Sequence, residues 1–404
     1  MFMLLTIAAA LAAPGDHLPV GSAMLSPRLG LGVDMSNNAL RSETPGDGAG
    51  AANLHLALGA ALKHDYRDLA WNLGGTYDLR KYVTTNDARL DRFDDFTLQG
   101  TADVLRLRVV GLRAEQQLAN RFTPVDTESP GRPYTTQFLS RSRAGVVVRP
   151  GSALEVTVSG VINVDDYNTA SSPVVGSRDY NRRYTYGPAL DLQWSFLPRT
   201  MAVLQASSST ASWSAPAIFV DGVEPIGFAD SDSLRALGGV RGRVTERLTI
   251  DALAGYADAT FDESTTTVGG DGVGVDVSGA QKIAAKLAGN YQLGPRDGVT
   301  LGYERDFRPS YFTNFVNFDR VSLVAHRQFT PAVQGGLDTS VASERFRGQQ
   351  TRDDVVLSAE ATASFSMNKW AVLRVTPGWT YRASSDPNVS YNELRGSVSL
   401  EADY

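Results

Sequence analysis

The chain offers few side chains that could perform catalysis. It has no cysteine among 404 residues, and its four histidines, His17, His55, His64 and His326, show no His-x-His spacing, so no zinc site is predicted. A barrel hydrolase needs a serine, a histidine and an orienting partner side by side on the outer wall. The alternation of apolar and polar residues around His326 directs its side chain away from the outer wall, toward the interior. We therefore predict that the protein is not an enzyme and needs no metal or cofactor.

Charged residues of both signs recur at alternate positions of otherwise apolar segments. The positions that we expect to line a lumen are Arg80, Glu155, Asp191, Asp251, Glu304, Asp306, Arg308, Asp338, Glu360, Arg374, Glu393 and Arg395. One interpretation is a set of salt-bridged ladders that keep a wide barrel round. The other is a hydrated pathway, because arginine and carboxylate groups hydrogen-bond the hydroxyls of a passing solute, and mixed charge gives little ion selectivity. The two interpretations are compatible.

The elements that would position these residues are β-strands. Apolar and polar residues alternate with period two in the segments 29–35, 69–79, 154–162 and 190–196. No segment keeps a helical period over a comparable length. The pattern predicts an all-β fold.

Turn signals divide the strands, and their spacing alternates. Short connections are expected near 63–65, 150–152, 198–199, 245–246, 294–297, 330–331 and 367–369. Longer ones are expected at about 36–50, 81–91, 122–134, 165–182, 212–231, 262–277, 308–314, 346–353 and 384–390. Short periplasmic turns and longer external loops are typical of outer-membrane barrels. The sequence predicts a single transmembrane antiparallel up-and-down β-barrel of about 18 strands (16–18).

The last strand has one apolar and one polar face. Leu394, Val398, Leu400 and Tyr404 share a face that suits lipid. The terminal aromatic resembles the signal that the barrel assembly machinery recognises, whereas the alternative is an edge strand of a soluble sandwich. The aromatics that we expect at the membrane interfaces are Trp71, Tyr77, Trp194, Tyr303, Trp379, Tyr381 and Tyr404.

The first residues predict export. The apolar run 1–13 is too short to cross a bilayer as a helix and ends in small residues, so it is assigned as a signal peptide, although no basic residue precedes it. Residues 14–25 are assigned to a periplasmic N-terminal segment and 26–404 to a barrel in the Gram-negative outer membrane. The net charge of −6 argues against a nucleic-acid partner.

The segment 302–311, GYERDFRPSY, followed by Val321-Ser322-Leu323, resembles the late strands of the β-barrel porin family. The overall plan is also similar to that of the porins of exopolysaccharide secretion in myxobacteria. That resemblance implies a channel that exports a polysaccharide delivered by separate periplasmic and inner-membrane components. The other expected partners are outer-membrane lipid, lipopolysaccharide and the barrel assembly machinery.

Two other functions stay open. An uptake porin for small hydrophilic solutes is equally compatible with a wide polar lumen. A structural or adhesive barrel with a plugged lumen would act through its external loops. We take polysaccharide export as the leading hypothesis.

Overall fold

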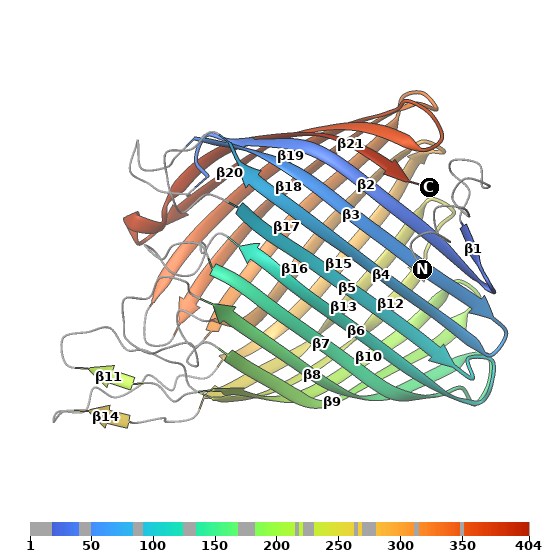
Figure 1. Cartoon of the computed structure of the whole chain (residues 1–404). Coiled ribbons are helices and arrows are strands. Elements are labelled where there is room, and N and C mark those ends of the chain that lie inside the picture. Colours follow the sequence, from blue (N-terminus) through green and yellow to red (C-terminus); the bar gives the residue numbers. More distant parts are fainter. Residues whose placement is uncertain are drawn as a thin grey trace.

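The strands pair with their neighbours in chain order and close into one barrel (Figure 1). This computed structural model describes residues 18–39, 50–83, 92–123, 135–168, 182–214, 218–220, 230–261, 266–268, 280–310, 315–347 and 351–403. The predicted signal peptide and Tyr404 lie outside these ranges. No helix in the described part of the chain is long and apolar enough to cross a membrane.

Eighteen antiparallel strands of 13 to 16 residues form the wall. They are β2 (Ala23–Ser36), β3 (Ala51–Tyr66), β4 (Leu69–Tyr82), β5 (Arg92–Val104), β6 (Val110–Thr123), β7 (Thr135–Val148), β8 (Leu154–Asn168), β9 (Arg182–Leu197), β10 (Thr200–Trp213), β12 (Ser231–Arg243), β13 (Leu248–Phe261), β15 (Ala280–Gly294), β16 (Asp297–Pro309), β17 (Phe315–Gln328), β18 (Val333–Arg347), β19 (Arg352–Ser366), β20 (Ala371–Ser384) and β21 (Tyr391–Asp403). The predicted fold class and strand number are confirmed.

The barrel closes where the last strand meets the first. β21 pairs antiparallel with β2, in a register that sets Val398 opposite Val33, and β20 pairs with the other edge of β21. Closure matters because hydrocarbon offers no hydrogen-bond partner to an open strand edge. Three short elements flank the wall: β1 (Leu18–Val20) pairs with β2, β11 (Ile218–Val220) pairs with β14 (Thr266–Val268), and a 3₁₀ turn spans Pro387–Val389.

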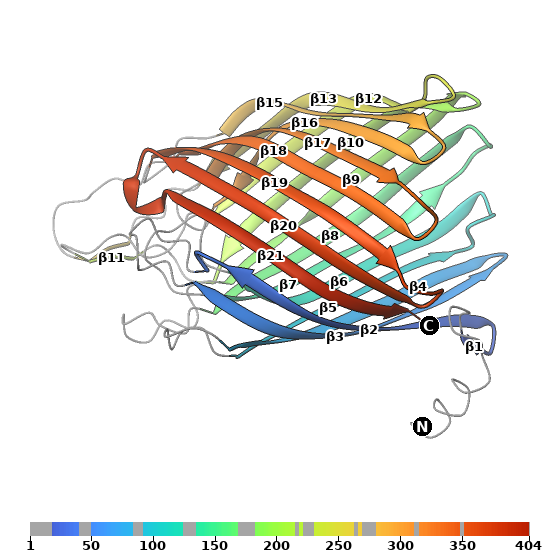
Figure 2. The same cartoon turned by 90° about the horizontal axis from the view of Figure 1, so that it is seen from above.

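The short connections all lie at one end of the barrel (Figure 2). The short ones are 67–68, 105–109, 149–153, 198–199, 244–247, 295–296, 329–332 and 367–370. Two differ from the prediction. The expected turn at 63–65 is wrong, because β3 continues through these residues to Tyr66. The turn at 105–109 was not predicted, since it contains neither glycine nor proline and reverses through Leu105, whose φ is +56°.

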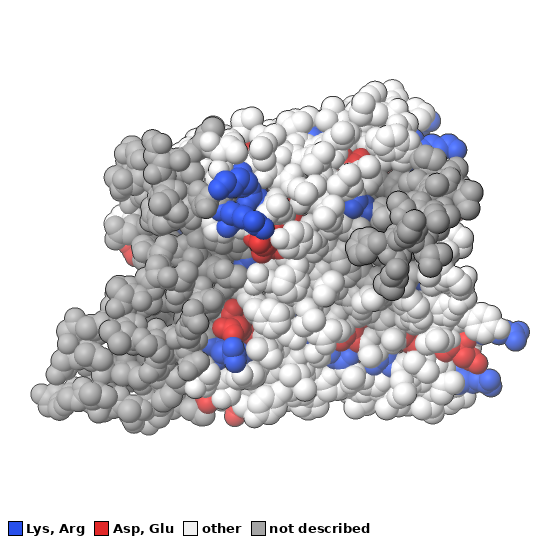
Figure 3. All heavy atoms as spheres, in the orientation of Figure 1, with Lys and Arg blue, Asp and Glu red and all other residues white. Residues whose placement is uncertain are grey.

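The outer surface carries an apolar belt. Side chains such as Leu31, Leu301 and Leu394 are more than half exposed, which a water-soluble protein would rarely tolerate over so many strands. In the face shown in Figure 3, uncharged residues fill the middle of the barrel and charged residues lie toward both ends. A closed barrel with an exposed apolar belt is the architecture of an integral outer-membrane protein, and the predicted localisation is confirmed.

Candidate functional site: the inner wall of the barrel

The charged positions that the sequence assigns to a lumen lie on the inner face of the sheet. Most of them alternate with outward apolar neighbours, as Asp338 does with the exposed Leu337 and Arg395 with the exposed Leu394. They share one face because successive side chains of a strand point to opposite faces of the sheet. Whether solute passes along this face stays a prediction.

Most of these charges are paired with neighbours on the same wall. Glu155 accepts from Arg113 at 3.3 Å and from Arg149 at 2.8 Å. Asp191 accepts from Arg143 and, at 3.1 Å, from Gln205. Two further pairs are Arg241–Asp251 at 2.9 Å and Arg374–Glu401 at 2.8 Å. Among the described residues, no ion pair is found for Glu304 or Asp338. The ladder interpretation therefore accounts for much of the wall.

The loop end of the β16–β17 hairpin leaves the wall. β15 and β16 stay paired only as far as Ala285 opposite Arg305, although β15 begins at Ala280 and β16 ends at Pro309. β16 and β17, in contrast, stay paired up to Pro309 opposite Phe315. β16 and β17 therefore stay paired with each other at their loop ends, but there both are separated from β15.

Packing shows where this hairpin end goes. By strand parity Phe307 should share the outer face with the exposed Leu301, yet it packs against a buried cluster on the inner faces of four other strands. That cluster consists of Val203, Leu237, Leu253, Ala257 and Ala284. The preceding residue, Asp306, forms an ion pair with Arg235 of β12, although β13 and β15 lie between β12 and β16 in the sheet. The hairpin end therefore lies inside the barrel.

An aromatic contact holds the hairpin end against β13. The rings of Phe315 and Phe261 stack with centroids 5.7 Å apart, and Phe307 meets Phe315 edge-on at 6.5 Å. Phe315 and Phe261 belong to a second buried cluster with Ala259 and Ala280. Aromatic pairs of this kind add about 0.5–1.5 kcal/mol to the burial of their surface. The hairpin end, packed against apolar residues of β13 and β15, therefore narrows the lumen.

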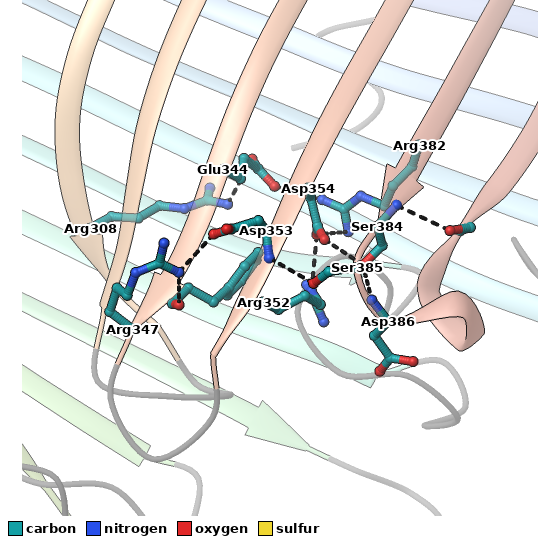
Figure 4. A network of polar contacts seen from close by, with 12 residues as sticks. Arg308, Glu344, Arg347, Arg352, Asp353, Asp354, Arg382, Ser384, Ser385 and Asp386 are labelled. Atoms are coloured by element: carbon teal, nitrogen blue, oxygen red, sulfur yellow. Dashed lines mark hydrogen bonds and ion pairs between the residues drawn. The ribbon is translucent and has the colours of Figure 1, made fainter.

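Beside this hairpin lies a buried ionic network on β16, β18, β19 and β20 (Figure 4). Glu344 accepts from Arg308 at 3.4 Å and from Arg382 at 2.6 Å. Asp354 accepts from Arg352 at 3.0 Å and from the Ser384 hydroxyl at 2.5 Å, and Arg382 lies 3.6 Å from its second oxygen. Burial strengthens the contacts among Glu344, Asp354 and Arg382, because water does not screen them, whereas Arg308 is partly exposed. The network fixes the loop ends of these strands.

The guanidinium of Arg352 also lies over the Phe346 ring, 4.0 Å from its centroid. Phe346 is fully buried and faces inward opposite Val316 of β17. This cation–π contact joins the ionic network to the apolar packing at the base of the hairpin.

A polar pocket of about 300 Å³ lies on the inner wall where the barrel closes. We call it the closure pocket. It brings together four of the predicted lumen residues, Arg80, Glu360, Glu393 and Arg395. Arg395 pairs with Glu360 at 2.9 Å, and the Ser36 hydroxyl donates to Glu393 at 2.9 Å.

The N-terminal side of the closure pocket adds further polar groups. Arg80 lies 3.0 Å from Asp78 and 3.6 Å from Asp95, and Asp34 lies 3.1 Å from His55. Asn53 and Tyr82 also line the space. The pocket therefore presents charges of both signs beside amide and hydroxyl groups.

The sequence did not identify several residues that shape this inner wall. Arg352 and Asp354 lie at or just past a segment, 346–353, that was assigned to a loop, and Arg382 precedes another. Phe307 and Phe315 carry no signal at all, because a period of two gives the face of a residue in its own strand and not the path of the strand end.

The predicted interface aromatics within the described residues lie on the outer face. Trp71 and Trp194 lie near the short-turn end, Tyr303 lies at the middle of β16, and Trp379 and Tyr381 lie in the loop-side half of β20. Trp379 and Tyr381 stack at 6.3 Å, and the Trp379 indole donates to Asn392 at 2.8 Å. Their position relative to the lipid headgroups stays a prediction.

Comparisons with known proteins place the fold among porins. No protein-family model matches the sequence, and no curated sequence matches it significantly. Pseudomonas aeruginosa OpdK, solved with vanillate, is similar with a TM-score of 0.50 and 12% identity over 94% of this chain and 99% of that one. A BenF-like porin from Pseudomonas fluorescens Pf-5 is similar with a TM-score of 0.50 and 11% identity, over 95% of this chain and 100% of that one.

The copper transporter OprC gives a TM-score of 0.51 and 12% identity over 92% of this chain and 63% of that one. At these identities the likeness concerns the fold alone. The similarity to the exopolysaccharide porins of myxobacteria is not shown by any of these comparisons. The chain has the fold of outer-membrane porins.

Proposed function

We propose that this barrel is a selective uptake channel for small hydrophilic solutes. The observation that carries the proposal is the closure pocket, a polar space of about 300 Å³ inside a barrel whose lumen a hairpin narrows. A space of this size accommodates a solute of roughly monosaccharide or amino-acid size. A narrowed polar passage favours short hydrophilic solutes over long chains.

The chemistry of the closure pocket limits the solute further. Arg395 and Glu360 are each about two fifths exposed, so their outer hydrogen-bonding positions remain accessible. Arginine and carboxylate groups bind hydroxyls and opposite charges with defined geometry. The pocket suits solutes that carry several hydroxyls or charges of both signs, and it offers little to an apolar molecule.

Uptake replaces polysaccharide export as the first hypothesis. Export was inferred from a resemblance that no comparison supports, whereas the porin fold and the narrowed lumen agree with the passage of small solutes. OpdK, which shares the fold, was solved with vanillate, itself a small molecule. No observation here favours a polymer.

Solute entry into liposomes tests the proposal. We expect vesicles that contain the protein to swell in a monosaccharide or in a zwitterionic amino acid, and to respond far more slowly to an oligosaccharide of about six units, which exceeds the pocket. The double variant Arg395→Met, Glu360→Met should change the ranking among charged and neutral solutes. Arg374→Met, Glu401→Met removes a similar inner pair outside the pocket and serves as the control.

Two results would overturn the proposal. Equal rates for the monosaccharide and the oligosaccharide would favour export of a chain. Absence of swelling in every solute would favour the plugged barrel.

A further inference from the structure

β15 and β16 are neighbours in the wall, but their loop ends are not joined. Their last pair is Ala285 opposite Arg305, although β15 begins five residues earlier, at Ala280, and β16 ends four residues later, at Pro309. Over these residues β15 is paired only with β13, and β16 only with β17. The wall therefore offers the end of β16 a place beside β15 that it does not occupy.

The ladder between β15 and β16 can be continued from this point without a change of register. Two of the next pairs would be Ile283 with Phe307 on the outer face and Lys282 with Arg308, two like charges, on the inner face. Phe307 would then lie in the apolar belt, which is where the alternation of β16 places it. The sequence of the strand end thus fits the wall.

The outer surface of β15 lacks a neighbour at this level. Leu287 and Ile283 share the outer face of β15, and Leu287 has Tyr303 of β16 opposite. Leu287 is 46% exposed, whereas Ile283, whose opposite position no residue of β16 occupies, is 70% exposed. Phe307 is the residue that the continued register would bring beside Ile283.

The inward position of the hairpin end leaves polar groups without partners. The facing backbone edges of 280–284 and 306–309 form no ladder with each other, and unpaired backbone groups are costly where water is excluded. Asn317, which stands opposite Phe307 on β17, is 7% exposed, and its side-chain oxygen has no hydrogen-bond partner among the described residues. In the wall, the backbone edges would pair and the outward side chain of Asn317 would reach the surface.

Other contacts favour the inward position. Phe307 and Phe315 pack there against apolar side chains of β13 and β15. The inward course of β16 also brings Asp306 to Arg235 of β12, although two strands separate β12 from β16 in the sheet. Both contacts would be lost if the end of β16 joined β15 in the wall.

Stabilising contacts therefore exist for each of two positions, which is the condition for a bistable element. We propose that the hairpin end, residues 306–309 and 315–317, is a gate of the barrel. In the inward position it narrows the lumen. In the wall position it pairs with β15 in the continued register and leaves the lumen wider, while β17 stays paired with β18. The effect on solute passage rests on the proposed function, whereas the two positions of the hairpin end do not.

Disulfide trapping tests this inference, because the chain has no cysteine of its own. The variant Ile283→Cys, Phe307→Cys is the test pair. A disulfide needs Cα atoms about 4.4–6.8 Å apart, which directly opposite residues of an antiparallel ladder satisfy. In the inward position the two side chains lie on opposite faces of the sheet and cannot meet. The control pair is Leu287→Cys, Tyr303→Cys, whose positions already stand opposite in the same ladder.

Both variants would be purified under reductant, inserted into lipid vesicles and then oxidised. We expect the control pair to cross-link fully, and the test pair to cross-link roughly 10- to 100-fold more slowly, as a minor state of about 1–10% would. In planar bilayers, the oxidised test pair should conduct more than the same protein after reduction. The control pair should conduct equally in both forms.

A second measurement keeps Phe307 in place. Asp306→Asn removes the ion pair with Arg235 that the inward position makes, so this variant should spend a larger share of time at the wider conductance level than the parent does. Asp297→Asn is the matched control, because it breaks the pair with Arg327 at the short-turn end of the same strand.

Three results would overturn the inference. They are a test pair that does not cross-link while the control pair does, an oxidised test pair that conducts like its reduced form, and equal occupancy of the wider level in Asp306→Asn and the parent. Cross-linking needs no solute. Absence of conductance in every variant would therefore contradict the channel function, while the cross-linking yield would still decide whether the hairpin end moves.

Discussion

At the residue scale, the inner wall depends on carboxylates that each serve more than one donor. Glu344 holds Arg308 and Arg382, and Asp354 holds Arg352 and Arg382. Arg382 is only 1% exposed, so removal of one of its two partners leaves a buried charge that is only partly compensated. Such a loss costs more than the pair itself contributes to stability.

We expect Arg382→Ala and Glu344→Ala each to lower the free energy of unfolding by about 3–5 kcal/mol, because each removes a main partner of a buried charge. The double variant should lose clearly less than the sum. Urea unfolding in lipid vesicles measures all three. Arg395→Ala, which breaks the half-exposed pair with Glu360, is the control and should cost at most about 1 kcal/mol. Additive losses in the double variant would show that the two side chains do not interact.

At this scale, alternation indicates which charged residues share a face of their strand, but it gives no sign of the buried network. Arg80, Glu360, Glu393 and Arg395 lie within strands of clear alternation, and they meet in the closure pocket. Arg352 and Asp354 lie at a strand boundary, where turn residues hide the period. Sequence pattern also says nothing of which inward charges are buried, because burial depends on what folds over them.

At the element scale, the strands that lie under the hairpin need close backbone approach. A Cβ on Gly255 of β13 would lie 1.9 Å from the Ala236 carbonyl oxygen, and one on Gly239 of β12 would lie 1.9 Å from that of Ala252. Only glycine fits such contacts, which bring β12 and β13 close together on the inner face. These two glycines lie beside Leu237 and Leu253, which receive the hairpin.

We expect Gly255→Ala to destabilise the barrel by about 1–3 kcal/mol, since the backbone must move to accept the methyl group. The measurement is the temperature at which the folded band disappears on an unboiled gel. Gly160→Ala is the matched control, because nothing lies within 4 Å of its Cβ position. An unchanged temperature for Gly255→Ala would contradict the close approach.

The strand order and the alternation of short and long connections were predictable, because turn residues and period two act locally. The turn at 105–109 was not predictable, because Leu105 adopts a positive φ, which leucine rarely does. The inward course of the β16–β17 hairpin was not predictable either. It follows from contacts of Phe307 and Phe315 with strands that are distant in sequence.

At the scale of the whole molecule, the outer surface of the barrel must also be apolar where the last strand, β21, pairs with the first, β2. Val33, Val398 and Val375 stand opposite one another on β2, β21 and β20, and Val375 and Val398 are exposed outward. Ser397, the next residue, faces inward opposite Asp34. Adjacent residues of β21 thus face the lipid and the interior of the barrel alternately.

We expect Val398→Arg to destabilise the barrel by about 2–4 kcal/mol, the cost of an arginine toward the middle of the lipid face. Ser397→Arg should be tolerated, because its side chain would lie beside Asp34. Urea unfolding in vesicles compares the two. A larger loss for Ser397→Arg than for Val398→Arg would reverse the assignment of the two faces.

Single-channel conductance in planar bilayers tests the central claim, that the chain is a channel narrowed by its own hairpin. The double variant Phe307→Ala, Phe315→Ala removes the packing that holds the hairpin end against β13. Phe365→Ala on the outer face serves as the control. We expect discrete openings for the parent and the control, and larger openings for the double variant. Absence of openings in the parent, or equal openings in all three proteins, would contradict it.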